Sequence, residues 1–161
     1  MRGNNQAIVF VRTGMKFLFV AMLLAASTNP FLATWKLNPE KSKMDPGAPA
    51  PKGDITMTYT AEGEGVRVTA SVTLPDGTKK NIVHTQTYDG KPHDRFEGNP
   101  NGETLTHRRI DERTEETTWR KDGKVIIVTT RTVSIDGKTL TSVMKVPEKS
   151  EPENVMVYEK Q

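Results

Sequence analysis

The chain of 161 residues contains no cysteine. This absence excludes disulfide bonds, thiol nucleophiles, zinc sites built on cysteine and a lipid attached to a lipoprotein cysteine. Aromatic residues are also scarce, at 6% of the chain. Beyond residue 27, no segment has the 3.6-residue hydrophobic periodicity of an amphipathic helix. The sequence therefore predicts neither a disulfide scaffold nor a helical protein.

The one long hydrophobic run lies near the N-terminus. All residues from Phe17 to Ala26 are apolar, Lys16 precedes them, and the small residue Ser27 follows. A basic residue, a short apolar run and small residues at its end are typical of a secretory signal peptide, whereas a membrane-spanning helix needs about 20 apolar residues. We expect residues 1–27 to be a helical signal peptide and residues 28–161 to be an exported domain, periplasmic or secreted. A retained anchor or a neighbouring cleavage site is the alternative.

The charge balance does not favour a nucleic-acid partner. The whole chain has a net charge of +3, but 3 of its 23 basic residues and none of its 20 acidic residues precede residue 28. The remaining domain therefore has equal numbers of positive and negative side chains. Because nucleic-acid binding needs a basic excess on one face, we expect no nucleic-acid partner. We also expect no stable membrane span after cleavage of the leader.

From residue 54 onward, apolar and polar residues alternate, which is the pattern of β-strands with one buried face. Ile55 to Ala61 and Val66 to Leu74 are two such runs joined by a glycine-rich turn, and they predict a hairpin. Further turns are marked by pairs that favour the positive φ of tight hairpins: Asp76-Gly77, Asp89-Gly90, Asn101-Gly102, Asp122-Gly123 and Asp136-Gly137. The predicted fold class is all-β, an antiparallel up-and-down meander of about eight to ten strands closed into a barrel. An open sheet or a two-layer sandwich fits much of the same pattern.

Two features modify this expectation. Residues 39–53 contain four prolines and two glycines, so we expect a surface excursion with at most one helical turn, from Glu40 to Lys43. The domain also has few hydrophobic residues, because many of those in the chain lie in the leader. A chain with regular alternation and so few hydrophobic residues indicates either an antiparallel sheet with one polar face or a barrel whose interior is itself partly polar.

The two ends of the domain resemble a known family. FLATWKLN, Phe31 to Asn38, is similar to the opening strand of fatty-acid-binding proteins and to the Gly-x-Trp strand of lipocalins, and VMVYEKQ, Val155 to Gln161, is similar to the last strand of fatty-acid-binding proteins. The chain also resembles small exported bacterial proteins described as lipocalin-like. The two strands pair in that superfamily, so the resemblance implies a lipocalin-like (calycin) barrel with Trp35 plugging one end. Such a barrel has room for one small ligand.

Two departures limit what the resemblance implies about the ligand. Residues 39–53 stand where fatty-acid-binding proteins have a two-helix lid. In that family, the last strand carries an Arg two residues before a Tyr, and the pair holds the fatty-acid carboxylate. Here Tyr158 matches the Tyr, but Met156 occupies the Arg position. The resemblance therefore does not imply the carboxylate clamp of the family.

Five residues are candidates for contact with a ligand: Trp35, Tyr59, Tyr88, Arg131 and Tyr158. Trp35 is expected mainly as a structural plug, and the tyrosines either orient a ligand through their hydroxyls or pack the core. Arg131 shares a strand face with Val133 and Ile135. If that face is inward, its guanidinium suits an anionic ligand. If Ile126 and Val128 mark the inward face, Arg131 is solvated.

No constellation indicates an enzyme, a metal centre or a cofactor. His84, His93 and His107 fall on separate strands or loops, whereas zinc needs three or four converging ligands. The four carboxylates between Asp111 and Glu116 are expected to be solvated in a polar turn, where nothing tunes them for acid–base chemistry. No Gly-x-Ser-x-Gly elbow or phosphate-binding glycine loop is present. We expect a non-enzymatic protein that binds a small hydrophobic or amphipathic molecule inside its barrel; a structural or protein-interaction module with a filled barrel is the alternative.

Overall fold

The computed structural model describes residues 29–44, 53–74, 76–93, 96–97, 103–147 and 154–161. The expected signal peptide, residues 1–27, lies outside the described residues, and its helix and cleavage stay predictions. Within the described part, no helix is long and apolar enough to cross a membrane. The described elements are β1 Thr34–Leu37, the 3-10 helix η1 Pro39–Lys41, β2 Lys43–Met44, β3 Ile55–Glu62, β4 Gly65–Thr73, β5 Lys79–Gln86, β6 Phe96–Glu97, β7 Thr104–Arg109, β8 Thr114–Lys121, β9 Lys124–Val133, β10 Thr139–Lys145 and β11 Asn154–Lys160.

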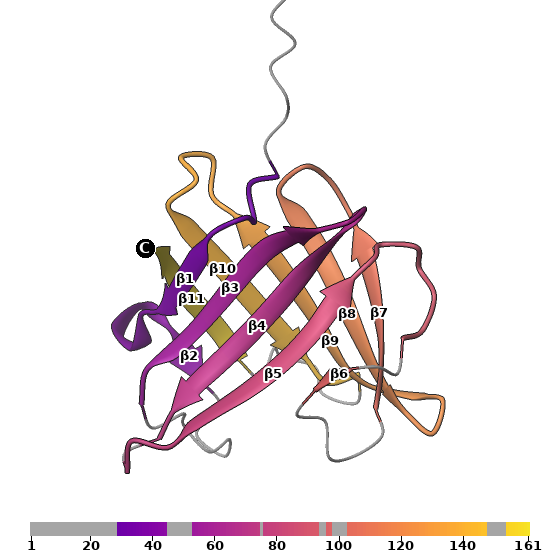
Figure 1. Ribbon diagram of the computed structural model, residues 1–161, viewed down its shortest axis with the longest axis horizontal. Coiled ribbons are helices and arrows are strands. Elements are labelled where there is room, and N and C mark those ends of the chain that lie inside the picture. Colours follow the sequence, from indigo (N-terminus) through magenta and orange to yellow (C-terminus); the bar gives the residue numbers. More distant parts are fainter. Residues whose placement is uncertain (1–28, 45–52, 75, 94–95, 98–102, 148–153) are drawn as a thin grey trace, which may run out of the picture.

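The strands form one antiparallel sheet that is rolled into a nearly closed barrel (Figure 1). The strand order is β6-β5-β4-β3-β1-β11-β10-β9-β8-β7, with β2 paired to β11. In Figure 1, the magenta strands β3 to β5 cross in front of the orange strands β8 to β10. The predicted all-β meander is therefore confirmed. Nine strands have four residues or more among those described, and β2 and β6 have two each.

The first strand, β1, and the last strand, β11, pair with each other, as predicted. Leu37 lies opposite Tyr158, and Trp35 lies opposite Lys160. On its other side, β1 pairs with β3, where Trp35 lies opposite Met57. The short strand β1 thus joins the two halves of the meander and buries the opening tryptophan in the barrel wall.

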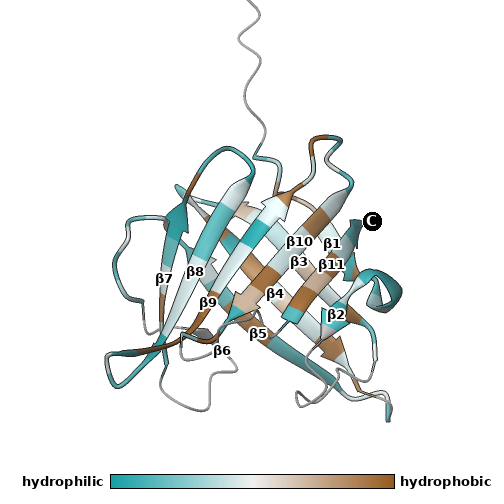
Figure 2. Cartoon of the chain, turned by 180° about the vertical axis from the view of Figure 1, so that it is seen from behind, coloured by the Kyte–Doolittle hydropathy of each residue, from teal (hydrophilic) through white to brown (hydrophobic). Residues whose placement is uncertain are grey.

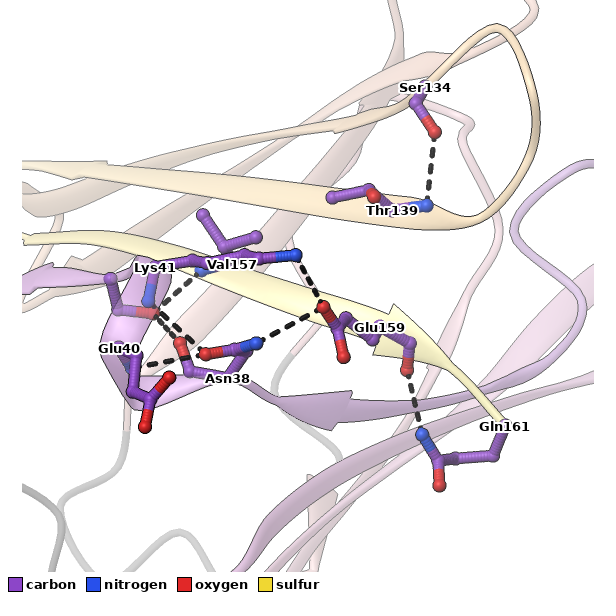
Figure 3. Close-up of polar contacts among 9 residues, drawn as sticks. Asn38, Glu40, Lys41, Ser134, Thr139, Val157, Glu159 and Gln161 are labelled. Carbon is purple, nitrogen blue, oxygen red and sulfur yellow. Dashed lines mark hydrogen bonds and ion pairs between the residues drawn. The ribbon is translucent and has the colours of Figure 1, made fainter.

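The helical turn after β1 is fixed to β11 by side chains (Figure 3). Asn38 caps η1 by accepting hydrogen bonds from two of its backbone N–H groups, and its Nδ2 donates to Glu159 Oε1 at 3.1 Å. Lys41 Nζ lies 2.7 Å from the same oxygen. The Ser42 hydroxyl donates to the Asn38 carbonyl at 2.7 Å and accepts from the Val157 N–H at 3.0 Å. A single helical turn forms as expected, but it spans Pro39–Lys41 and not Glu40 to Lys43, because Lys43 and Met44 pair with β11 as strand β2.

Most of the predicted turns also form. The β8–β9 loop has two residues, Asp122 and Gly123, with φ of 51° and 77°, which are the two positive values that a type I′ hairpin turn requires. Gly77, Gly90 and Gly137 have positive φ at three of the other predicted turns. The expected Asn101-Gly102 turn lies outside the described residues.

The barrel has one seam, between the β5 side and β7. Across it, the described residues make one isolated bridge, between His93 and Leu105. The His93 N–H donates to the Leu105 carbonyl at 2.7 Å, and the Leu105 N–H donates back at 2.9 Å. Elsewhere, each strand is joined to its neighbour by a ladder of register pairs.

The core is concentrated at the end of the barrel where the β7–β8 and β9–β10 loops lie, the upper end in Figure 1. We call this the closed end. Its fully or almost fully buried apolar side chains are Phe31, Trp35, Leu37, Met57, Tyr59, Val66, Val68, Val133, Leu140 and Tyr158. Along the same strands, hydrophobic and hydrophilic segments alternate (Figure 2).

The opposite end of the barrel, which holds the β8–β9 turn, is less well covered, and we call it the open end. On β3, Tyr59 and Met57 are buried, but Ile55 is half-buried. The same change occurs on β10, where Leu140 is buried and Met144 is half-buried. Ile82, on the strand face of buried His84, is 37% exposed. Inward-facing side chains are therefore sealed from solvent at one end and partly accessible at the other.

Candidate ligand-binding site

A buried ion pair lies in the barrel interior on strands β8 and β9. Glu115 and Arg131 are register partners on the two strands, and Arg131 Nη1 lies 3.8 Å from Glu115 Oε1. The side chain of Glu115 is 1% exposed and that of Arg131 is 11% exposed. A charge pair with so little solvent needs further hydrogen bonds to offset the cost of desolvation.

Two tyrosines supply hydrogen bonds to the carboxylate. The Tyr59 hydroxyl, from β3, donates to Glu115 Oε1 at 3.2 Å. The Tyr88 hydroxyl, which follows β5, donates to Glu115 Oε2 at 2.6 Å, with Gln86 Oε1 as a second acceptor at 2.8 Å. Burial and the neighbouring Glu115 charge raise the pKa of both tyrosines. Both hydroxyls therefore keep their protons and act as donors, and both carboxylate oxygens are occupied.

A β-bulge places this pair on one face. At the β8–β9 turn, Lys121 lies opposite Lys124 and Arg120 opposite Val125, but the register then skips Ile126, so that Trp119 lies opposite Ile127. A one-residue shift of register exchanges the faces of a strand. Continued without the bulge, the turn would place Glu115 opposite Thr130, and Glu115 and Arg131 would face opposite sides of the sheet.

The second part of the site is built on one threonine hydroxyl. Arg131 Nη1 donates to Thr117 Oγ1 at 3.1 Å, and His107 Nδ1 lies 3.2 Å from the same oxygen. Thr117 is therefore shared between the guanidinium and the imidazole. Two buried polar atoms of this group, Arg131 Nε and His107 Nε2, have no hydrogen-bond partner among the described residues.

His107 also stacks on a second buried histidine. The rings of His84 and His107 are parallel within 3°, with centroids 5.1 Å apart. Burial lowers the pKa of His84 to about 4 and that of His107 to about 3, and the nearby Arg131 charge acts in the same direction. Both imidazoles are therefore neutral at neutral pH. In the described part of the chain, no group of three or more His, Asp or Glu side chains could hold a metal ion.

Aromatic side chains seal the closed end beside the polar cluster. Trp35 is fully buried, and its indole N–H donates to the Phe31 carbonyl at 2.9 Å. The ring of Phe31 lies 5.8 Å from that of Tyr59. The guanidinium of half-buried Arg109 lies over the rings of Phe31 and Tyr88, 4.7 Å and 4.5 Å from their centroids, in cation–π contacts. This end is filled by side chains.

The structure brings four of the five candidate residues to this cluster or next to it. Tyr59, Tyr88 and Arg131 contact Glu115. Tyr158 is 3% exposed, and its hydroxyl points to the Met156 thioether at 3.5 Å. Trp35 belongs to the aromatic seal. Between the two orientations considered for Arg131, the inward one is correct; contact with a ligand stays a prediction for all five residues.

Two expectations were wrong. Glu115 was expected to be solvated, but it is buried, because strand β8 points Glu115 and Thr117 inward. Its signal in the sequence was the alternation Glu115, Thr117, Trp119, which does not by itself say which face is inward. Ile135 was expected to share the strand face of Arg131, yet it is 87% exposed whereas Arg131 points inward. Strand β9 ends at Val133, so the alternation no longer holds at residue 135.

The barrel is similar to solved structures of fatty-acid-binding proteins. A Schistosoma mansoni fatty acid binding protein in complex with arachidonic acid shares 18% identity over 84% of this chain and 98% of its own, with a TM-score of 0.65. A point mutant of the REP1-NXSQ fatty acid transporter shares 15% identity over 83% and 100%, with a TM-score of 0.57. The fatty-acid-binding protein of Manduca sexta shares 14% over 80% and 98%, with a TM-score of 0.56. The chain therefore has the barrel fold of these proteins, which its terminal strands suggested.

No protein-family model matches the sequence, and no curated protein does. The likeness to the solved barrels at these low identities establishes the fold, and the function has to be argued from the interior of this chain. Among the described residues, that interior combines a neutral pair of opposite charges, several hydroxyls and the unpartnered Arg131 Nε and His107 Nε2 atoms with a sealed end and a partly accessible end. It can hold a polar group by hydrogen bonds.

Proposed function

We propose that this protein is an exported, non-enzymatic carrier that binds a small hydrophobic or amphipathic molecule inside its barrel. The observation that carries the proposal is the difference between the two ends. Apolar inward side chains such as Ile55 and Met144 are half-buried at the open end. Deeper in the barrel lies the polar cluster around Glu115 and Arg131, which is almost fully buried. An apolar chain bound at the open end would remove the exposed apolar surface from water.

The position of each part supports one mode of binding. The apolar part of the ligand would lie among the side chains of the open end, and its polar end would reach the hydroxyls and nitrogen atoms near Arg131 and Thr117. Ligand sites are commonly apolar with a few convergent polar groups. The solved barrels of similar fold include a fatty acid binding protein with arachidonic acid, which supports a chain-like ligand. Export rests on the leader-like residues 1–27.

The two tryptophans provide a local test. Trp119 is half-buried on the inward face of β8, whereas Trp35 is sealed in the closed end. Two variants, each with a single tryptophan, are produced from the full sequence. Each variant is titrated with a panel of single-chain lipids. We expect the emission of Trp35→Phe, which retains Trp119, to change on binding, and that of Trp119→Phe to change much less.

Native mass spectrometry of the protein purified from bacterial cells provides a second test of ligand binding and export. We expect a co-purified small molecule and an intact mass that shows removal of the leader. No co-purified molecule together with no fluorescence response to the panel would contradict ligand binding and favour a structural or protein-interaction module. An uncleaved leader with the protein retained in the cytoplasm would contradict export alone.

A further inference from the structure

The interior ion pair determines which kind of polar head the barrel can accept. Arg131 is the cation that would attract a carboxylate, but Glu115 already lies 3.8 Å from its Nη1 atom. Both oxygens of Glu115 accept hydrogen bonds from tyrosine hydroxyls that keep their protons. Glu115 is thus the negative partner of Arg131, and the pair has no net charge. A second carboxylate placed at Arg131 would sit close to a buried anion.

The other charged group nearby does not change this balance inside the barrel. Arg109 is the register partner of Glu115 on the β7 side of β8, but it is half-buried at the closed end. Its guanidinium lies on the rings of Phe31 and Tyr88, where contact with solvent screens its charge. Toward the open end, Ile82, Trp119 and Met144 carry no charge, whereas exposed Lys80 and half-buried Glu103, which continue the inward faces of β5 and β7, carry opposite charges.

Two buried polar atoms beside the ion pair have no hydrogen-bond partner among the described residues, and both are donors. Arg131 Nε carries a hydrogen and has no described partner. Thr117 Oγ1 accepts from Arg131 and can give its own proton to His107 Nδ1 at 3.2 Å. A neutral imidazole that accepts at Nδ1 carries its hydrogen on Nε2, and Nε2 is the second buried atom without a partner among the described residues. Arg131 and His107 are 9% and 2% exposed.

A buried donor without an acceptor costs free energy that a bound acceptor recovers. The Tyr158 hydroxyl has only a thioether, a weak acceptor, as its described partner, and it offers a further donor. Among the described residues, the interior therefore has buried donors without acceptors, while Glu115 already supplies a negative charge beside Arg131. We propose, on the basis of the carrier function proposed above, that the ligand is an amphipathic molecule with an uncharged, hydrogen-bond-accepting head, such as an amide, ester or other carbonyl, and that Glu115 excludes carboxylates.

Two ligands with the same alkyl chain test this inference. Dodecanamide and dodecanoate are titrated at neutral pH into protein produced from the full sequence, by displacement of an apolar fluorescent probe. We expect dodecanamide to bind about tenfold more tightly or better, because like charges brought together in a poorly hydrated site repel strongly. Equal or tighter binding of dodecanoate would overturn the inference and leave the carrier function standing. Binding of neither ligand would overturn both.

The variant Glu115→Gln identifies the cause. It keeps the size of the side chain and removes the charge, so Arg131 is left without its anion. We expect the affinity for dodecanoate to rise by about tenfold or more relative to that for dodecanamide. The matched control is Glu116→Gln, which makes the same change at the next residue of β8, where Glu116 pairs with exposed Arg108. It should leave the ratio of the two affinities unchanged.

An unchanged ratio in a folded Glu115→Gln protein, or the same change in both variants, would contradict the role of Glu115. Circular dichroism establishes that each variant is folded. If Glu115→Gln does not fold, the ratio measured with the unmodified protein still decides the proposal, because that ratio needs no substitution.

Discussion

The two ends of this barrel are built from the same strands and differ in how their inward side chains meet solvent. At the closed end, Trp35, Tyr59 and Leu140 are at most 2% exposed. At the open end, Trp119 and Met144 stand on the same inward faces and are half-buried. The alternation of apolar and polar residues thus determines which way a side chain points, whereas burial depends on what lies above it.

Under the proposed carrier function, this difference separates stability from binding within one sheet. The closed end has a packed aromatic and aliphatic core, which is the main source of folding free energy. The open end has apolar side chains that are only half-buried, and these would gain more from contact with the proposed ligand than they gain from folding. Substitutions at the two ends should therefore have different consequences, and their order tests the comparison.

Among the single substitutions, the largest effect is expected at the tryptophan of the closed end. Trp35→Ala removes a fully buried side chain and should lower the free energy of unfolding by about 3–5 kcal/mol, because a cavity replaces well-packed atoms. Trp119→Ala, at the open end, should cost no more than about half of that. Urea denaturation measures both. Equal losses at the two positions would contradict the distinction between the ends.

Acidification should destabilise the protein through the buried histidines. Burial depresses the pKa of His84 to about 4 and that of His107 to about 3, whereas the unfolded chain takes up protons near pH 6.5. The contribution of these histidines to the free energy of unfolding is therefore fully present above pH 6.5. The free energy of unfolding falls as the pH is lowered toward 4, by about 1.4 kcal/mol per pH unit for each histidine. Urea denaturation at several pH values measures the slope.

Two variants test whether the buried histidines cause the slope of the free energy of unfolding against pH. His107→Phe should lose a large part of it, whereas His93→Gln should keep it, because the side chain of His93 is 35% exposed. A slope that is unchanged by His107→Phe would show that other groups cause the pH dependence.

A smaller effect is expected for the hydroxyl of Tyr88. Tyr88→Phe removes the 2.6 Å hydrogen bond to Glu115 Oε2 and leaves the ring over which Arg109 lies. We expect a loss of about 1.5–3 kcal/mol, the range for a hydrogen bond to a charged group. Chemical denaturation at neutral pH is the measurement, and a loss below about 0.5 kcal/mol would mean that the carboxylate finds another donor.

The smallest effect on stability is expected at Ile82. This side chain is already 37% exposed, so Ile82→Ser should change the free energy of unfolding by about 0.5 kcal/mol or less. Binding of an apolar ligand should nevertheless weaken measurably. A large loss of stability without any change in binding would reverse the roles assigned to the two ends.

The fold could be predicted to a large extent, because its signals are local. Asp122-Gly123 has the backbone conformation that its residue types favour, and the terminal strands that resemble a known barrel do pair. The inward position of Arg131 was one of two alternatives that the alternation left open. The resemblance to known barrels predicted that Trp35 would seal one end. It did not predict that Phe31 would be part of this seal.

The partner of Arg131 could not be predicted, because it depends on a bulge. The residues around Glu115 are polar on both faces of the strand, so periodicity does not distinguish inside from outside. The skipped residue, Ile126, has the same character as its neighbours in a β-prone run, and no residue type marks the shift of register. The difference in side-chain exposure between the two ends could not be predicted from the sequence either, because it arises from the arrangement of all the strands together.

The seam gives the barrel an unequal resistance to widening. Between most neighbouring strands, a change of diameter would break a ladder of register pairs, such as the one between β3 and β4. At the seam, the described backbones are joined by the two hydrogen bonds of His93 and Leu105, and side chains add the hydrogen bond from Tyr88 to Glu115 and the stacked rings of His84 and His107. In mechanical terms, the wall is weaker along this line, because separation of the strands there would break fewer backbone hydrogen bonds than separation of β3 from β4.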